Sequence, residues 1–269
     1  MFTKVYDSNN EKFSLHITIK CKEEKEFGII AQDYGKPNSQ YANRQIKVKG
    51  ERIIYLSFPI SPKQIELQVW NLKNEKDGDY TIVLERKPLK DYNIWMDAET
   101  KDFLGLAIHF SQICGFEEAN QKGRLFTTED RKFKIKFFNS IYDYKSGKIL
   151  NTPARIGHNT GIIEVAKAKF DSYTIPMRMI ILLHEFSHKY KNPKLGLDIS
   201  NEIGADVNAL YIYLGLGFSK IDAICVFANV FLKAQTKGNI ERMRKIMDYI
   251  QKFESGQFAK PNVEFSNVQ

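Results

Sequence analysis

The sequence predicts an α+β fold, with a β-rich domain at residues 1–92 and a mainly helical domain at residues 93–269. Two patterns support this division. The first ninety residues alternate apolar and polar side chains with the period of half-buried strands, and no helix-length period interrupts them. Beyond residue 97, most apolar side chains recur at helical spacing instead. We therefore expect a β-sandwich-like domain or small barrel, followed by a domain that carries additional C-terminal helices.

The β-rich domain contains several strand-like runs. In the clearest, apolar side chains alternate with polar ones from Phe13 to Ile19. The predicted strands cover residues 13–20, 45–49, 52–58, 65–72 and 80–87. A polar stretch that contains Asp77-Gly78 separates the last two, which is typical of a hairpin with a longer loop.

The second domain begins with a predicted helix that Asp97 caps and Gly115 ends. Two short strand-like runs and four helical patterns follow. The strand-like runs cover residues 133–138 and 161–170, and the helices cover residues 176–190, 201–214, 219–235 and 239–253. The helix at 219–235 is apolar almost all round, which fits either a central core helix or a subunit interface.

The net charge of +8 is spread evenly, with an excess of four positive charges before residue 91 and four after it. Small basic groups, such as Arg242, Arg244 and Lys245, are interpreted as parts of a solvated helix face. A dedicated nucleic-acid reader concentrates its positive charge on one stripe or arm. The sequence therefore indicates no specific nucleic-acid partner.

The sequence also bears on location. Its first residues lack the apolar core of a signal peptide, and its most apolar later run, residues 221–232, is too short to span a bilayer. The three cysteines, Cys21, Cys114 and Cys225, are widely separated and odd in number, which indicates no disulfide framework. We expect a cytoplasmic protein without a membrane partner, and the oligomeric state stays open.

The segment His184-Glu185-Phe186-Ser187-His188 is an HExxH motif. Residues four apart share one face of a helix, so both imidazoles can bind a single metal ion. Glu185 lies to the side, where it can contact a metal-bound water without binding the metal. Residues 180–183 before the motif are all apolar, and polar side chains in such surroundings need partners. A bound zinc ion would provide such a partner for the two histidines.

A catalytic zinc ion usually takes three protein ligands and leaves one position for water. The first helix is expected to end near Tyr190, and Ser200 or Asn201 can cap a second helix. On that helix Glu202 and Asp206 share one face, and the chain before it is long enough to reverse direction. Glu202 is therefore the expected third ligand. Asp206 can accept the second ring N–H of a ligand histidine.

HExxH followed by ExxxD resembles the signature of the gluzincin metallopeptidases, the thermolysin-like peptidases. Within that group the chain is most similar to the small ImmA/IrrE-type peptidases, which place an extended segment and an arginine before the motif. The matching parts, in order, are residues 161–165, Arg178, residues 184–188 and residues 202–206, within a resemblance that covers roughly residues 97–215. The resemblance implies a zincin-like fold with His184, His188 and Glu202 as zinc ligands, Glu185 as general base and Asp206 as the partner of His184.

The resemblance further implies that an edge strand before the active-site helix pairs with an extended peptide substrate. Residues 162–169 directly precede that helix and are the candidate strand. Thermolysin-like enzymes also use a tyrosine or histidine to stabilise the developing oxyanion. Five residues stay open for this role: Tyr173, Tyr190, Tyr211, Tyr213 and His158.

Zinc-dependent hydrolysis of a peptide or protein substrate is the expected function, with Glu185 as general base. The β-rich domain is expected to bind a protein partner or to position the substrate. The alternative is a structural or assembly protein, for example of a phage virion, that retains a zinc-binding zincin fold. The lysine-, asparagine- and aromatic-rich composition and the size of the β-rich domain favour this alternative.

Overall fold

A computed structural model of the 269-residue chain describes residues 1–73, 79–89, 92–190, 192–195 and 202–258. The centre of the predicted hairpin loop, with Asp77-Gly78, and the proposed capping residues Ser200 and Asn201 lie outside the described residues. The chain is α+β. It divides into two compact units, Met1–Leu89 with Thr174–Pro176, and Lys90–Tyr173 with Met177–Gln269.

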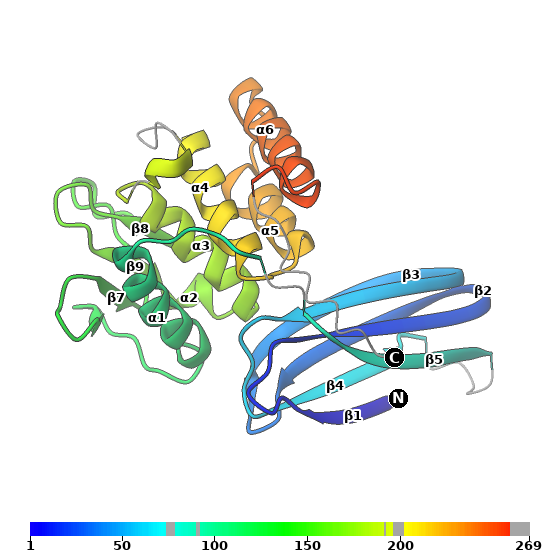
Figure 1. The fold of residues 1–269 in the computed structure, drawn as a ribbon. Coiled ribbons are helices and arrows are strands. Elements are labelled where there is room, and N and C mark those ends of the chain that lie inside the picture. Colours follow the sequence, from blue (N-terminus) through cyan, green and yellow to red (C-terminus); the bar gives the residue numbers. More distant parts are fainter. Residues whose placement is uncertain (74–78, 90–91, 191, 196–201, 259–269) are drawn as a thin grey trace. The chain divides into compact units, whose positions relative to one another are not determined.

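Two long antiparallel strands, β2 (Phe13–Asp33) and β3 (Lys36–Phe58), form the framework of the first unit (Figure 1). Their pairing shifts register between Cys21 and Lys25, and Gly50 on β3 takes a positive φ of 76° at the same level. The hairpin is thereby divided into two halves. The first half of β2 pairs with β5 (Tyr80–Pro88), and the second half pairs with β4 (Gln64–Asn71), which also pairs with β1 (Phe2–Asp7).

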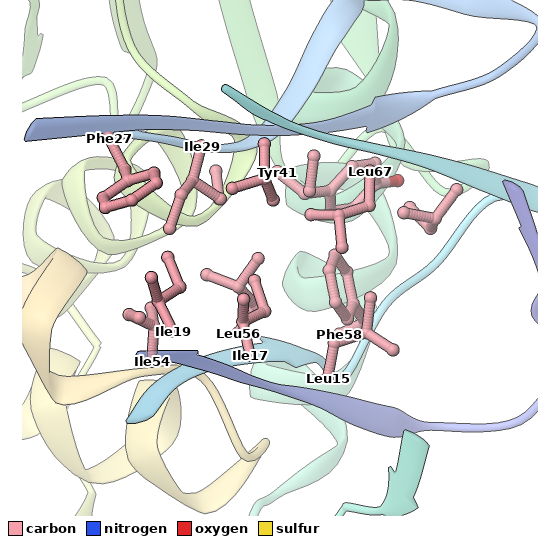
Figure 2. Packing of buried hydrophobic residues seen from close by; sticks show 14 of the residues in the cluster. Leu15, Ile17, Ile19, Phe27, Ile29, Tyr41, Ile54, Leu56, Phe58 and Leu67 are labelled. Atoms are coloured by element: carbon pink, nitrogen blue, oxygen red, sulfur yellow. The ribbon is translucent and has the colours of Figure 1, made fainter. Parts of the chain in front are cut away.

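The two halves face each other across one hydrophobic core. Figure 2 shows Leu15, Ile17 and Ile19 from the first half of β2 opposite Phe27 and Ile29 from the second half. All five side chains are buried. Burial of each large apolar side chain contributes about 1.5–3 kcal/mol, so the alternating pattern fixes which face of each strand turns inward.

The structure corrects the predicted hairpin between residues 65–72 and 80–87. In the described residues β4 and β5 do not pair with each other, because each pairs with a different half of β2. The connection between them therefore leads from one half of the bent hairpin to the other. Strand β1 and the extension of β2 to Asp33 were not predicted.

The second unit begins with α1 (Ala98–Ile113), in which the side chain of Asp97 accepts a hydrogen bond from the backbone N–H of Thr100 at 2.7 Å. The predicted cap is confirmed, and Cys114 ends the helix next to Gly115. The buried face of α1 includes two phenylalanines, Phe103 and Phe110. The ring of Phe103 stacks on that of Phe186 in the HExxH helix, with centroids 4.2 Å apart.

A four-stranded sheet lies in the same unit, in the order β6 (Arg124–Thr127), β7 (Lys134–Phe138), β9 (Ile163–Ala166) and β8 (Ala154–Ile156). Strand β9 runs parallel to β7 and antiparallel to β8. The predicted substrate strand at residues 162–169 is therefore wrong. Its strand portion is interior to the sheet, and its last residues belong to the short helix α2 (Lys167–Phe170).

Six further helical segments follow in the described residues. They are α3 (Ile175–Ser187), the 3-10 turn Pro193–Leu195, α4 (Glu202–Gly215), α5 (Lys220–Val226) with the π-helical turn η2 (Phe227–Phe231), and α6 (Lys237–Glu254). Helix α4 is buried at every residue from Gly204 to Gly215, so its burial extends beyond the apolar face that the sequence predicted. The predicted helix at 219–235 is shorter, since the π-helical turn ends it at Leu232. None of the helices in the described residues is long and apolar enough to cross a membrane.

Candidate metal centre

Helix α3 carries both histidines of the HExxH motif. Its residues from Met179 to Leu183 are fully buried, so the helix axis is fixed by apolar packing. The buried guanidinium of Arg178 donates to the backbone oxygens of Phe170, Ser111 and Asp171 and connects the start of α3 to the ends of α1 and α2. Arg178 is therefore a structural residue, and no contact joins it to the histidines.

The histidines share one face of α3, as their spacing of four requires. Nε2 of His184 lies 3.1 Å from Nε2 of His188. The carboxylate of Glu202, at the first residue of α4, faces both rings. One oxygen lies 3.5 Å from Nε2 of His184 and the other lies 3.7 Å from Nε2 of His188. These three side chains form the candidate metal-binding group of the described residues.

The donor set fits zinc. Two zinc bonds of about 2.0–2.1 Å that meet at a tetrahedral angle separate their donor atoms by roughly 3.3 Å. The three separations of 3.1, 3.5 and 3.7 Å bracket that value. Two imidazoles and one carboxylate are also the ligand set of many catalytic zinc sites, which keep a fourth position for water.

Asp206 lies one turn beyond Glu202 and is buried, with 1% of its side chain exposed. Its Oδ1 is 2.9 Å from Nδ1 of His184. The N–H of that ring nitrogen is not well aligned with the oxygen, so the pair is a close ionic contact rather than an ideal hydrogen bond. Asp206 nonetheless faces the nitrogen that points away from the metal-binding group and so orients the ring.

Arg242 on α6 also belongs to the site, which corrects its interpretation as part of a solvated helix face. Only 13% of its side chain is exposed, and its guanidinium donates two hydrogen bonds to the carboxylate of Asp206, both 2.9 Å long. One of its nitrogens also lies 3.0 Å from Glu202. Arg244 and Lys245, by contrast, are largely exposed as predicted.

Sequence reasoning missed Arg242 because 36 residues separate it from Asp206 and no local pattern connects them. One signal was present. Asp206 stands in the apolar segment from Ala205 to Leu214, and a buried carboxylate requires a cationic or hydrogen-bonding partner. That signal predicts a partner without identifying it.

Glu185 lies beside the metal-binding group without belonging to it. The residue is buried, and this burial raises the pKa of its carboxyl. The nearby charge of His184 and a hydrogen bond from the backbone N–H of Ile156 act in the opposite direction. Ile156 is the last residue of β8, so this hydrogen bond connects the carboxyl of Glu185 to the outer strand of the sheet.

The ligand side chains influence one another electrostatically. Burial lowers the pKa of His184, but Asp206 and Glu202 raise it further, to about 9. A hydrogen bond to His184 lowers the pKa of Glu202 to about 2, against the effect of burial. Both shifts favour a protonated His184 and an ionised Glu202 before a metal ion binds, so metal binding competes with a proton on the histidine.

The π-helical turn η2 forms another wall of the site. It places the ring of Phe231 against His184, with centroids 4.2 Å apart and planes inclined by 33°. π-helical turns often occur at functional sites because they shift one side chain out of helical register. Phe231 is half-buried. Its ring therefore packs against the imidazole of a candidate metal ligand.

The five residues considered for oxyanion stabilisation lie in different surroundings. The hydroxyl of Tyr211 accepts from the backbone N–H of Trp95 at 2.9 Å, and Tyr213 stacks on Phe218. The remaining two tyrosines pack against phenylalanines: Tyr173 meets Phe170 edge to face, and Tyr190 stacks on Phe186 and meets Phe133 edge to face. His158 follows β8 in an exposed turn. Burial lowers the pKa of His188, the charge of His184 lowers it further, and His158 adds a smaller effect in the same direction.

No family model, curated protein or solved structure matches the chain. The chemistry of the site therefore rests on the described side chains themselves: a group of two histidines and a glutamate, a buried glutamate beside it, and an aspartate and an arginine behind it.

Proposed function

We propose that the chain is a zinc-dependent peptidase of the gluzincin type. The observation that carries the proposal is the combination of the His184, His188 and Glu202 group with a buried carboxyl, Glu185, that does not belong to the group. A purely structural zinc site has four protein ligands and no need for a fifth polar side chain beside the metal. An open fourth position next to a general base is instead the arrangement of a hydrolase.

The proposal extends to architecture. The unit that contains the ligands is a zincin-like peptidase domain with additional helices α5 and α6. The β-rich unit binds a protein partner or presents the substrate. The expected setting is the cytoplasm, where zinc-dependent cleavage would act on a peptide or on another protein.

His184, His188 and Glu202 would hold the zinc ion, which would supply Lewis acidity for the scissile carbonyl and for an attacking water. Glu185 would accept a proton from the water and transfer it to the leaving amine. Its burial raises the pKa of the carboxyl towards the working pH, which suits both steps. Asp206 keeps the imidazole of His184 in one orientation throughout.

The outer strand β8 replaces residues 162–169 as the proposed substrate-binding strand. Ala166 donates to the oxygen of Pro153, and Gly157 donates to the oxygen of Ile162. Because alternate residues of an antiparallel strand point to opposite sides, the backbone groups of Ala154 and Ile156 are directed away from β9. The N–H of Ile156 donates to Glu185 and the oxygen of Ala154 accepts from Thr152, so the N–H of Ala154 and the oxygen of Ile156 are the groups proposed to pair with a peptide. An extended peptide that adds to this edge lies next to Glu185.

A cleavage assay tests the proposal. Zinc-loaded full-length protein is incubated with a mixed peptide library, and new termini are identified by mass spectrometry. We expect cleavage that a zinc chelator abolishes and that added zinc restores, with no cleavage by His184→Ala. Zinc-loaded protein that cleaves neither the library nor any protein of its host extract would contradict the peptidase proposal.

A further inference from the structure

Arg242 contacts two side chains of α4, Glu202 of the metal-binding group and Asp206 beside that group. Its NH2 nitrogen lies 2.9 Å from Oδ1 of Asp206 and 3.0 Å from Oε2 of Glu202. Oδ1 of Asp206 is in turn 2.9 Å from Nδ1 of His184, whose Nε2 is 3.5 Å from Oε2 of Glu202. The four side chains therefore form a closed ring of polar contacts, and two of its members are proposed zinc ligands.

Glu202 needs such a contact more than the histidines do. Its side chain is 54% exposed, at the first residue of α4, whereas the histidines lie on a helix packed in the core. An exposed glutamate loses considerable rotamer entropy when it is held in one position. A guanidinium 3.0 Å from one of its oxygens restricts that freedom before any metal binds.

The chemistry of arginine fits this position. Its planar fork donates Nε and NH2 to the two oxygens of Asp206 in a bidentate pair, and the same NH2 is shared with Glu202. Its charge also compensates Asp206, a buried carboxylate that would otherwise be costly. Lysine carries the same charge but cannot form the bidentate pair of hydrogen bonds.

We propose that Arg242 is a positioning residue of the metal centre, which holds Glu202 and, through Asp206, His184 in the arrangement that binds zinc. This inference rests on the proposed zinc site and adds α6 to it. Arg242 does not bind the metal itself. Helix α6, which lies outside the HExxH and ExxxD segments, thereby determines how tightly the site holds its ion.

Zinc affinity of the full-length chain, measured by competition with a chromophoric chelator, tests this role. We expect Arg242→Gln to weaken zinc binding ~10–100-fold, the usual effect of removing a side chain that orients metal ligands. Arg242→Lys should weaken it less, because the charge remains. The matched control is Arg244→Gln on the same helix, since the side chain of Arg244 is 75% exposed and contacts Glu241 rather than the site.

A second readout separates positioning from simple support of the fold. A salt bridge that only stabilises the fold would lower the melting temperature of the metal-free protein and leave zinc affinity unchanged. A positioning residue changes affinity in protein that is still folded, and changes the visible spectrum of the cobalt-substituted site. If Arg242→Gln does not fold, the same comparison is made with Arg242→Lys, which retains the charge that Asp206 requires.

The outcomes are distinguishable. In one outcome, wild-type protein binds zinc and His184→Ala does not, while folded Arg242 variants keep the wild-type zinc affinity and the wild-type spectrum with cobalt. That outcome would contradict the role of Arg242 and leave the zinc site supported. If wild-type protein binds no zinc, the site and the role of Arg242 fail together.

Discussion

The side chain of Asp206 lies directly behind His184, with 2.9 Å between Oδ1 of the carboxylate and Nδ1 of the ring. This pairing leaves Nε2 of His184 turned towards His188 and Glu202. A carboxylate in this position fixes the tautomer of a metal-binding histidine and increases its basicity. The pair therefore connects the interior of α4 to the metal-binding face of α3.

The first prediction concerns this pair. Asp206→Asn keeps the shape of the side chain but removes the charge that faces His184 and Arg242. We expect zinc affinity to fall ~10–100-fold. Competition with a chelator measures the change, and Asp248→Asn, at an exposed position of α6, is the control. Wild-type affinity in Asp206→Asn would show that the carboxylate does not orient the ligand.

The second prediction concerns the ligand set. Purified protein should contain about one zinc ion per chain, as a mononuclear site requires. His184→Ala, His188→Ala and Glu202→Ala should each lower zinc content, measured by elemental analysis, because each removes one donor. A full complement of zinc in Glu202→Ala would identify it as the wrong third ligand.

The helices that carry the motif could be predicted because the residues that determine them lie close together in the sequence. The HExxH spacing places His184 and His188 on one face of any helix, and the N-cap at Asp97 depends only on its neighbours. Glu202 was predictable from its spacing to the motif together with the three-ligand rule for zinc. Its distances to the two rings could not be derived before the structure brought α3 and α4 together.

The structural features that could not be predicted from the sequence depend on contacts between residues far apart in the chain. The β4 and β5 strands alternate correctly, yet their partners are opposite halves of β2, which local patterns do not encode. The same holds for β8, a strand of three residues that is too short to show a period. Arg242 resembles any surface arginine until α6 lies beside α4.

The third prediction concerns the edge of β8. Proline at Ile156 removes the N–H that faces Glu185 and points away from β9, while the hydrogen bonds from β9 to Pro153 and from Gly157 remain. We expect Ile156→Pro to bind zinc normally but to cleave with roughly tenfold lower kcat/KM, the cost of about one hydrogen bond. Ile156→Val retains the N–H and is the control. Wild-type kcat/KM in the proline variant would show that the hydrogen bond from β8 to Glu185 does not support cleavage.

The fourth prediction uses the cysteines to examine α5. Cys21 and Cys114 are buried, and burial raises the pKa of the Cys114 thiol to about 11, whereas Cys225 is exposed. A thiol must ionise to react, so brief alkylation of native protein at neutral pH should modify Cys225 and spare the other two. Mass spectrometry of the digested protein identifies which cysteines are alkylated. Protection of Cys225 that increases with protein concentration would instead support the subunit interface considered for this helix.

The central claim, that the site hydrolyses peptides, is tested most directly by Glu185→Gln. Glutamine retains the size of the side chain and its packing but cannot accept the proton of a zinc-bound water. We expect this variant to keep its zinc and its melting temperature and to cleave ~10²–10⁴-fold more slowly than wild type. Where no substrate is known, the variant is introduced into the native host, and the accumulation of an uncleaved protein is measured by proteomics. A Glu185→Gln host that behaves as wild type, while His184→Ala loses function, would show that the zinc is structural and contradict the peptidase account.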